Sequence, residues 1–227
     1  MTSREFRARL LKRARKADLA IPSPLVAPLE IYFRLLARWN EKINLTALPV
    51  DEITDQAVDR LFVEPLAAAR FVPERPIEWF DLGSGGGSPA LPLKLARPAA
   101  RLTMVESKTR KAAFLREAVR TLALEDVTIE NARFEVVALR ADHRRAVDLL
   151  TVRAVKIDKS VIRAAAALLA SHGRLMLFSG RPRSGGEPTQ PFQFVQTVRL
   201  AASDASNLAI LERVDVSDQI VPRGTPP

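Results

Sequence analysis

A glycine-rich turn between a short apolar segment and a helical segment most constrains how this chain can fold. Residues 77–82 are typical of a strand, the turn runs from Asp81 to Gly87, and residues 90–97 are typical of a helix that Pro98 ends. Glycines let the chain reverse sharply and let backbone N–H groups approach a ligand without interference from a Cβ atom. The segment therefore predicts the first strand–turn–helix unit of an α/β sheet, although glycines at this spacing also serve ordinary tight turns.

The rest of the chain after residue 73 alternates between short apolar strands and amphipathic helices. The predicted elements are strands over 101–105, 127–130, 146–152 and 174–178, helices over 108–122 and 160–171, and two closing strands over 192–198 and 210–216. This alternation predicts a parallel sheet with crossover helices. The two closing strands fit an antiparallel hairpin at the edge of that sheet.

The residues before the sheet carry helical patterns and no strand signal. Helices are predicted over 3–17, 25–39 and 52–70, and the prolines at 22, 24, 73 and 76 separate or end them. The chain is thus expected to form a helical N-terminal extension over 1–72, a Rossmann-like domain over 73–221 and a disordered tail over 222–227.

Composition excludes several classes of protein and of site. The chain has no cysteine and only two histidines, His143 and His172, so we expect neither disulfides nor a metal site. No apolar run approaches the roughly 18 residues of a membrane-spanning helix, and the basic N-terminus lacks the apolar core of a secretory signal. We therefore expect a cytoplasmic, monomeric enzyme with no membrane partner.

The net charge of +9, with a pI of about 10.6, favours a polyanionic partner. Basic residues cluster near the start, where the first eighteen residues contain Arg4, Arg7, Arg9, Lys12, Arg13, Arg15 and Lys16. Many soluble proteins with arginine-rich compositions are also basic, so charge alone leaves both interpretations open. The clustering favours nucleic acid, because evenly spread charges would not steer a partner.

Two carboxylates indicate which nucleotide-like ligand the turn would hold. Asp81 stands at the start of the turn and Glu106 ends the next strand. A carboxylate at the second position can accept both ribose hydroxyls of a nucleoside. Asp81 would repel the pyrophosphate of a dinucleotide but suits the ammonium group of S-adenosylmethionine, which carries no phosphate. The pair favours S-adenosylmethionine over NAD; a helix-capping Asp and a surface Glu are the ordinary alternative.

Several motifs in order along residues 25–180 resemble the RsmG family, also called GidB. The motifs are Trp39–Ala47 before the sheet, Gly87–Leu93 with its two prolines, Val105–Lys108, Arg110–Arg116, and Arg153-Ala154 after the fourth strand. The resemblance implies the fold of the class I S-adenosylmethionine-dependent methyltransferases. It also implies methylation of N7 of a guanine in bacterial 16S ribosomal RNA, with that RNA or the small ribosomal subunit as partner.

The chain departs from the family pattern on the side where substrate is expected. Leu61 stands in place of a family histidine, and Pro65 replaces a serine four residues later. Ser179 replaces a lysine after the fifth strand, and Val152 replaces the serine before Arg153. The resemblance therefore marks a divergent member, and these losses affect the RNA side more than the cofactor side.

The residues expected at the site fall into two groups. The cofactor group is Asp81, Gly83, Ser84, Gly85, Gly87 and Glu106, with Asn131, Ala132 and Arg133 after the third strand, beside the adenine. The substrate group is Asn44, Thr46 and Arg153, and Arg153 is also the catalytic candidate. Arg153 either binds a phosphate or the guanine edge, or forms an ordinary strand-end ion pair. Asn44 and Thr46 either line the crevice or cap a turn, and Arg133 is equally well explained as an exposed side chain.

Two further features leave alternatives open. Lys108, Arg110, Lys111 and Arg116 form either a track for RNA or a solvated helix face. Trp39 is better explained as a core aromatic residue than as a platform for a base.

A guanine N7 target fits the lack of an obvious catalytic base. N7 carries an in-plane lone pair and no proton, so proximity and orientation can supply most of the acceleration. The same lack also suits a non-catalytic RNA-binding protein. Two further alternatives stay open: a methyltransferase with a small-molecule or protein substrate, and an NAD-dependent enzyme.

Overall fold

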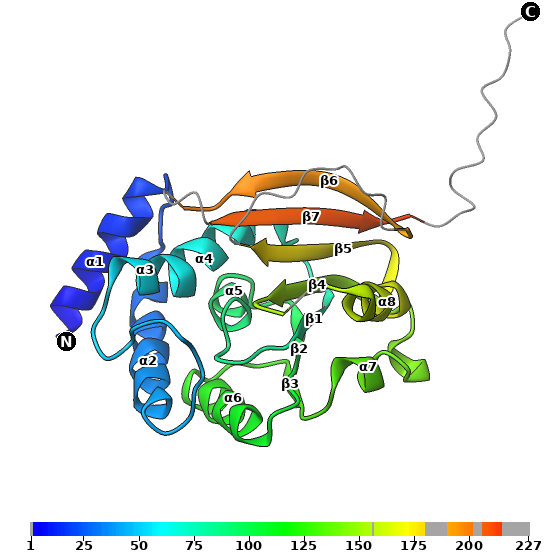
Figure 1. The fold of residues 1–227 in the computed structure, drawn as a ribbon. Coiled ribbons are helices and arrows are strands. Elements are labelled where there is room, and N and C mark those ends of the chain that lie inside the picture. The colour runs from blue at the N-terminus through cyan, green and yellow to red at the C-terminus, as the bar shows by residue number, and fades with distance from the viewer. Residues whose placement is uncertain (1, 156, 180–189, 202–205, 215–227) are drawn as a thin grey trace, which may run out of the picture.

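The computed structural model describes residues 2–155, 157–179, 190–201 and 206–214, and these contain one seven-stranded sheet (Figure 1). The strands are β1 (Glu78–Leu82), β2 (Arg101–Val105), β3 (Val127–Glu130), β4 (Val147–Arg153), β5 (Leu169–Ser179), β6 (Phe192–Arg199) and β7 (Asn207–Arg213). They lie in the order β3-β2-β1-β4-β5-β7-β6. Strands β1 to β5 are parallel, and β7 runs antiparallel to β5 and β6. The predicted α/β sheet and its closing hairpin are confirmed.

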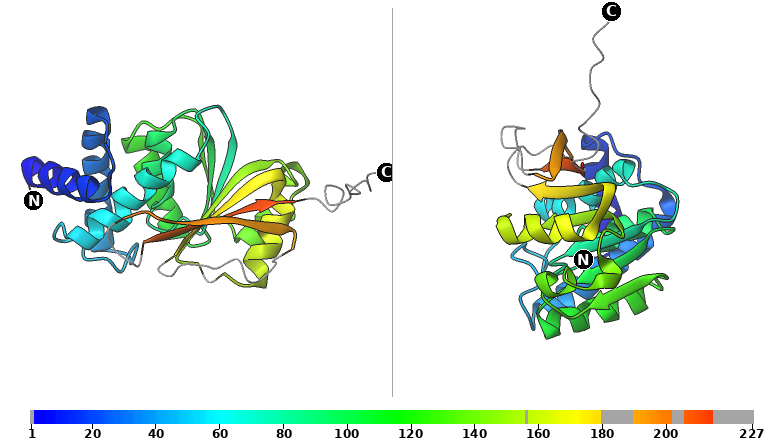
Figure 2. Two further views of the ribbon diagram at one scale, coloured as in Figure 1. Left: turned by 90° about the horizontal axis from the view of Figure 1, so that it is seen from above. Right: turned by 90° about the vertical axis from the view of Figure 1, so that its right-hand side faces the viewer.

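The two faces of the sheet belong to two hydrophobic cores, because successive side chains of a strand point to opposite faces. The helices that cover the sheet are α5 (Ala90–Ala96), α6 (Thr109–Thr121), α7 (Phe134–Val137) and α8 (Lys159–Leu168). Trp79 and Met104 pack with α5, α6 and the N-terminal helices, whereas Phe80 and Leu150 pack with α7 and α8. Figure 2 shows helices on both sides of the twisted sheet.

The predicted helical extension is confirmed and packs on the first of these cores. Its main helices are α1 (Ser3–Lys16), α2 (Ser23–Asn40), α3 (Asp55–Val58) and α4 (Glu64–Ala68). Phe62 is the centre of their contact: its ring lies 5.6 Å from Phe6, 6.0 Å from Tyr32 and 6.2 Å from Phe33, between ring centroids. These aromatic side chains join α1, α2 and the α3–α4 segment into one layer beside the sheet (Figure 2).

The continuous helix predicted over 52–70 is wrong in its start and in its regularity. Thr54 caps the segment by accepting a hydrogen bond from the Ala57 amide, so the helix begins at Asp55. A π-helical turn (Asp59–Val63) then separates α3 from α4, and a 3₁₀ turn (Ala69–Phe71) ends the segment. Pro65 explains the interruption, because it has no N–H to donate to the carbonyl four residues earlier, that of Leu61.

Two other predicted boundaries were wrong. The helix predicted to Ser171 ends at Leu168, because Leu169 already pairs with Val147 as the start of β5, and the register shifts before Leu149 pairs with Arg174. The strand predicted over 210–216 lies three residues earlier. This register is favoured because pairing of β7 with β5 buries the apolar residues 208–211.

The described part of the chain contains no helix long and apolar enough to cross a membrane. The predicted disordered tail over 222–227 lies outside the described residues. The division of the chain at residue 72 stays a prediction.

The ion pair between Arg13 of α1 and Asp59 of the π-helical turn predicts a large effect on stability. Arg13 Nε donates to Asp59 Oδ1 at 2.8 Å, and the two side chains are 11% and 7% exposed. Asp59→Asn leaves a buried guanidinium short of its main partner, although Asp55 Oδ2 stays 3.2 Å from it. We expect the free energy of unfolding to fall by about 3 kcal/mol in chemical denaturation.

Arg9→Gln is the matched control, because the Arg9–Asp55 pair has side chains that are 43% and 48% exposed. Its loss should change the free energy of unfolding by less than about 1 kcal/mol. Equal effects of the two variants would contradict a stabilising role for the Arg13–Asp59 pair.

Candidate functional site

The glycine turn lies at the carboxyl end of β1, against the end of β2. The amides of Gly83 and Ser84 donate to the Val105 carbonyl at 2.9 and 3.1 Å. Gly83 has a φ of +75°, and a Cβ atom on it would lie 2.6 Å from Cγ2 of Val155. Both the left-handed conformation and the lack of space require glycine here. The turn therefore presents bare backbone at this edge of the sheet.

Glu106, at the end of β2, is held by the backbone of the turn. Its Oε2 accepts from the Gly85 amide at 2.9 Å, and its Oε1 accepts from the Lys108 amide at 2.7 Å. The residue is 6% exposed, yet its side chain lines a pocket. A carboxylate has about four acceptor positions, so the two amides leave capacity for further donors, such as the two hydroxyls of a ribose.

Asp81 is buried beneath the turn. Its Oδ1 accepts from the Thr151 hydroxyl at 2.5 Å, and Thr151 in turn accepts from the Trp79 indole at 2.9 Å. Burial raises the pKa of Asp81 to about 6; the hydrogen bonds from Thr151 and Ser84 and the charge of Arg153 oppose that rise. Strand β4 thus holds the Asp81 carboxyl beneath the turn, and burial there raises the pKa of this carboxyl.

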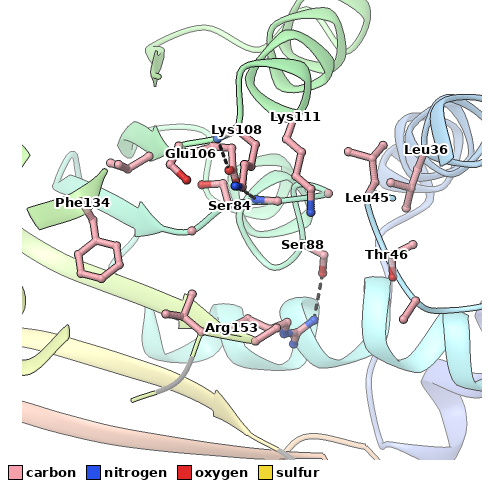
Figure 3. Close-up of a pocket in the computed structure, with 18 of the residues that line it drawn as sticks. Leu36, Leu45, Thr46, Ser84, Ser88, Glu106, Lys108, Lys111, Phe134 and Arg153 are labelled. Carbon is pink, nitrogen blue, oxygen red and sulfur yellow. Dashed lines mark hydrogen bonds between the residues drawn. The ribbon is translucent and has the colours of Figure 1, made fainter. Parts of the chain in front are cut away.

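A pocket of about 800 Å³ opens at the carboxyl ends of β1, β2 and β4 (Figure 3). Its size is within the usual range for a small-molecule site, ~300–1,000 Å³. In Figure 3 Lys108 and Lys111 project from the start of α6, while Leu45 and Thr46 border the pocket from the N-terminal extension. The site is therefore built jointly by the sheet and the extension.

Helix α2 holds the glycine turn from the side opposite the sheet. The Tyr32 hydroxyl donates to the Gly86 carbonyl at 2.6 Å, and a Cβ atom on Gly86 would lie 3.2 Å from the Leu45 carbonyl oxygen and 3.3 Å from Leu36 Cδ1. Asn40 shapes the following loop, since its Oδ1 accepts from the amides of residues 45 and 46 at 2.9 and 3.0 Å. The extension is thus a wall of the pocket.

The residues predicted from sequence divide into those on the pocket wall and those behind it. The pocket is lined by Thr46, Gly83, Ser84, Gly85, Glu106, Ala132, Arg133 and Arg153. The lining does not include Asn44, which is exposed, or Asp81, Gly87 and Asn131. Asn131 lies behind the pocket wall and contacts a lining residue, since its Nδ2 donates to the Glu106 carbonyl at 2.9 Å.

Arg153 ends β4 and is engaged mainly by the protein itself. Its Nη1 donates to the Ser88 hydroxyl at 3.0 Å and to the Arg60 carbonyl, and its Nη2 donates to Glu64 Oε2 at 2.8 Å. The guanidinium also lies 4.5 Å from the centroid of the Phe178 ring. This geometry matches the strand-end ion pair that the sequence left open, at the wall of the pocket.

Trp39 lies where the sequence predicted it, and two of the four basic residues over 108–116 reach the pocket. Trp39 packs edge-on against Phe114 and its indole donates to Glu117 Oε2 at 3.1 Å, as a core aromatic residue does. Lys108 and Lys111 line the pocket.

The sequence did not reveal Arg60, Glu64 or the leucines of the pocket wall. Arg60 lines the pocket and Glu64 is buried beside it. No local pattern separates Arg60 from the other arginines. The one signal that could have found it was its place directly before the stretch that departs from the family pattern.

The strand order and the pocket at the ends of β1, β2 and β4 define the class of protein: it has the Rossmann-like fold of the S-adenosylmethionine-dependent methyltransferases. A SAM-dependent methyltransferase from Aquifex aeolicus aligns with a TM-score of 0.53 at 12% identity, over 71% of this chain and 94% of that one. TrmN from Thermus thermophilus aligns with a TM-score of 0.50 at 20% identity, over 66% of this chain and 49% of that one.

Residues 26–186 match the family GidB, rRNA small subunit methyltransferase G. A protein of Roseiflexus sp. (strain RS-1) named ribosomal RNA small subunit methyltransferase G is 37% identical over 75% of this chain and 72% of its own length. One of the same name from Stenotrophomonas maltophilia (strain K279a) is 36% identical over 72% of this chain and 73% of its own length. The chain belongs to this family, which confirms the resemblance seen in its motifs.

The raised pKa of Asp81 predicts a specific dependence of stability on pH. Between the unfolded value, 3.8, and the folded value, about 6, the folded state binds a proton that the unfolded state does not. The free energy of unfolding that this group contributes therefore rises as the pH falls through that window. The free energy of unfolding of the wild type should exceed that of the Asp81→Asn variant by more at pH 5 than at pH 7. We expect this excess to differ by about 1 kcal/mol between the two pH values.

Urea denaturation of both proteins at the two pH values measures this difference. Asp142→Asn, at a side chain that is 74% exposed, controls for the general loss of a carboxylate. The same difference between wild type and variant at both pH values would contradict the assignment to Asp81.

Proposed function

We propose that this protein binds S-adenosylmethionine in the pocket and methylates ribosomal RNA of the small subunit at N7 of a guanine. The observation that carries the proposal is the pairing of Glu106 with the Gly85 amide at the joined ends of β1 and β2, in a chain of this family. That pairing sets a ribose-binding carboxylate against bare glycine backbone. The expected cytoplasmic location and monomeric state stay predictions.

The residues present fit the cofactor. Glu106 retains acceptor capacity for the ribose, and the bare backbone at Gly83, Ser84 and Gly85 admits a ligand at close range. Ala132 and Arg133 line the same pocket, where they would border the adenine. Asp81 would support the ammonium end from beneath the turn. Bound S-adenosylmethionine would supply the electrophilic methyl group.

The acceptor side needs residues that orient a base and bind its phosphates. Guanine N7 has no proton to lose, so the protein need only bring the lone pair into line with the methyl group. Thr46 and Arg153 line that pocket, and we propose that they border the acceptor, with Asn44 near the entrance. Arg153 would act by holding this wall in place, since Glu64 and Ser88 already bind its guanidinium.

Glu106→Gln tests the cofactor assignment. The amide cannot accept from the ribose and from both backbone amides as the carboxylate does, and charge-assisted hydrogen bonds contribute about 1.5–3 kcal/mol. We therefore expect calorimetry to give roughly 10- to 100-fold weaker binding of S-adenosylmethionine. Glu125→Gln, at an exposed position, is the control and should bind as the wild type does.

The same titration separates the cofactor alternatives. Absence of binding by the wild type at near-millimolar S-adenosylmethionine would contradict the methyltransferase proposal and favour a non-catalytic RNA-binding protein. Preference for a dinucleotide would favour NAD-dependent chemistry.

Methylation of 16S RNA from a strain that lacks the modification tests the substrate. We expect transfer of one methyl group to a guanine of that RNA, located by mass mapping, in naked RNA or in assembled small subunits. Binding of the cofactor without transfer to either form would redirect the search to a small-molecule or protein substrate.

The exposed face of α1 predicts that RNA binding depends steeply on salt. Arg9 and Arg13 pair with acidic residues of the α3 region, but Arg4, Arg7, Lys12, Arg15 and Lys16 have no ion pair within the described residues and lie on or near the outer side of the helix. Replacing Arg4, Arg7 and Arg15 with Gln should flatten the plot of log affinity against log salt by about 0.7–0.9 for each phosphate that the variant no longer neutralises. Filter binding between 50 mM and 200 mM salt measures the slope. An unchanged slope would exclude α1 from the RNA-binding surface.

A further inference from the structure

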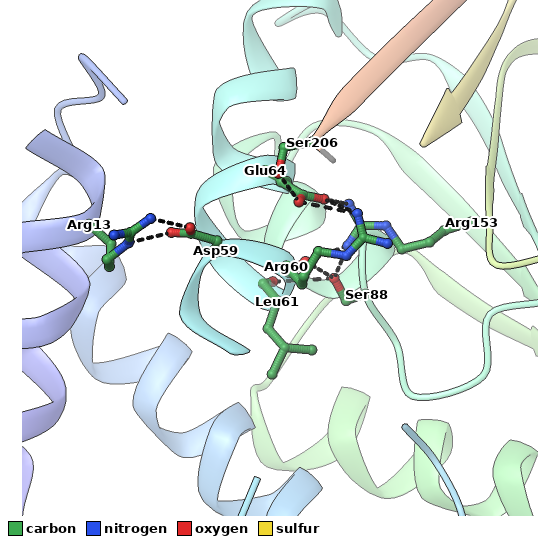
Figure 4. Close-up of polar contacts among 8 residues, drawn as sticks. All are labelled: Arg13, Asp59, Arg60, Leu61, Glu64, Ser88, Arg153 and Ser206. Carbon is green, nitrogen blue, oxygen red and sulfur yellow. Dashed lines mark hydrogen bonds and ion pairs between the residues drawn. The ribbon is translucent and has the colours of Figure 1, made fainter. Parts of the chain in front are cut away.

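A buried carboxylate beneath the acceptor side of the pocket joins four separate segments (Figure 4). Glu64 of α4 is 1% exposed. It accepts from Arg153 Nη2 at 2.8 Å, from the Ser206 hydroxyl at 2.6 Å, and from Arg60 Nη1 at 3.3 Å to each oxygen. One carboxylate therefore organises the π-helical turn, the end of β4 and the start of β7.

The cluster brings two guanidinium groups to one carboxylate. Arg60 and Arg153 share the single negative charge of Glu64, and their guanidinium groups lie side by side in Figure 4. Burial lowers the pKa of Arg153 to about 10; the charge of Glu64 opposes this shift and that of Arg60 adds to it. Arg153 therefore remains protonated at neutral pH, and the Glu64 and Asp81 carboxylates oppose the shift.

The two arginines differ in how exposed their side chains are. Arg153 has a side chain that is 9% exposed and is bonded to Glu64, to Ser88 and to the Arg60 carbonyl. Arg60 has a side chain that is 30% exposed, lines the pocket, and reaches Glu64 at 3.3 Å rather than 2.8 Å. Both arginines line the pocket, and Arg60 is the more exposed of the two.

We propose that Arg60 binds a phosphate of the RNA next to the acceptor base and that Glu64 is the positioning residue that holds Arg60 for this contact. The proposal rests on the proposed methylation of RNA. The planar guanidinium of Arg60, at the pocket wall, offers a phosphate two parallel N–H donors. Arg153 and Ser206 bind the Glu64 carboxylate, which in turn binds the Arg60 guanidinium at the pocket wall.

The first experiment compares Arg60→Gln, Arg60→Lys and Arg163→Gln, each in the full chain. Arg163 is exposed on α8 and does not line the pocket, so its variant removes the same charge elsewhere. For Arg60→Gln we expect the KM for 16S RNA to rise about 10-fold and the salt slope of RNA binding to fall by about one. The Kd for S-adenosylmethionine should stay within about twofold of the wild type. Arg60→Lys should recover the salt slope but only part of the KM.

Glu64→Gln separates positioning from simple neutralisation. If Glu64 only offset positive charge, its loss would tighten RNA binding, because the site would gain a charge. If Glu64 positions Arg60, its loss weakens RNA binding, and the double variant with Arg60→Gln is no worse than Arg60→Gln alone. We expect the second result. Should Glu64→Gln fail to fold, the Arg60 variants decide the phosphate contact, and Ser206→Ala, with a smaller effect of the same kind, tests the positioning.

The outcomes distinguish this inference from the proposed function. Wild-type protein that transfers no methyl group to 16S RNA would overturn the proposed function. Wild-type transfer with Arg60→Gln indistinguishable from Arg163→Gln in KM and salt slope would overturn the phosphate contact alone. Tighter RNA binding by Glu64→Gln or Ser206→Ala would overturn the positioning role.

Discussion

The reversal of strand order beside β1 is the constraint on which the rest of this structure depends. From β1 the sheet extends through β2 to β3 on one side and through β4 to β5 on the other. Parallel strands place their carboxyl ends on one edge, and at such a reversal the flanking loops separate and leave a crevice. Gly83, Glu106 and Arg153 come from the ends of three different strands, and they reach one pocket only because those strands are neighbours.

Around this crevice the protein buries several charges and satisfies them in two different ways. At the ends of β1 and β2, Asp81 and Glu106 accept hydrogen bonds from hydroxyl and amide donors, which leaves negative charge beside the turn. On the other side, Glu64 is shared between Arg60 and Arg153, which leaves positive charge. This polarity would suit the proposed ligands, a cationic methyl donor and a polyanion. Such a cluster is stable only while its members stay in contact, because each buried charge is costly without its partner.

Sequence reasoning succeeded where local chemistry and position are tightly linked. Gly83 could be predicted because its backbone conformation excludes other residues, and the meeting of Glu106 with the turn because neighbouring parallel strands end at one edge of the sheet. It failed at two points, one set by a proline within the segment and one by pairing with a distant strand. The helix over 52–70 is interrupted because Pro65 lacks a donor, and the released Leu61 carbonyl accepts from Ser88. The start of β5 at Leu169 follows from pairing with β4, which overrides helical propensity in an alanine-rich segment.

By itself, the sequence determined the α/β sheet, the glycine turn and the family. It also determined that Asp81 and Glu106 stand at the ends of two successive strands. Each of these features depends on patterns within short stretches of the chain. Only the tertiary structure decided what Arg153 contacts, that Asp81 lies beneath the turn, and that Tyr32 and Leu45 of the extension close the pocket. Those features depend on which segments meet across the sheet, and no local pattern encodes a contact between residues as far apart in the chain as Tyr32 and Gly86. The glycine turn could be predicted from its own residues, whereas the pocket wall that faces it is formed by segments from distant parts of the chain.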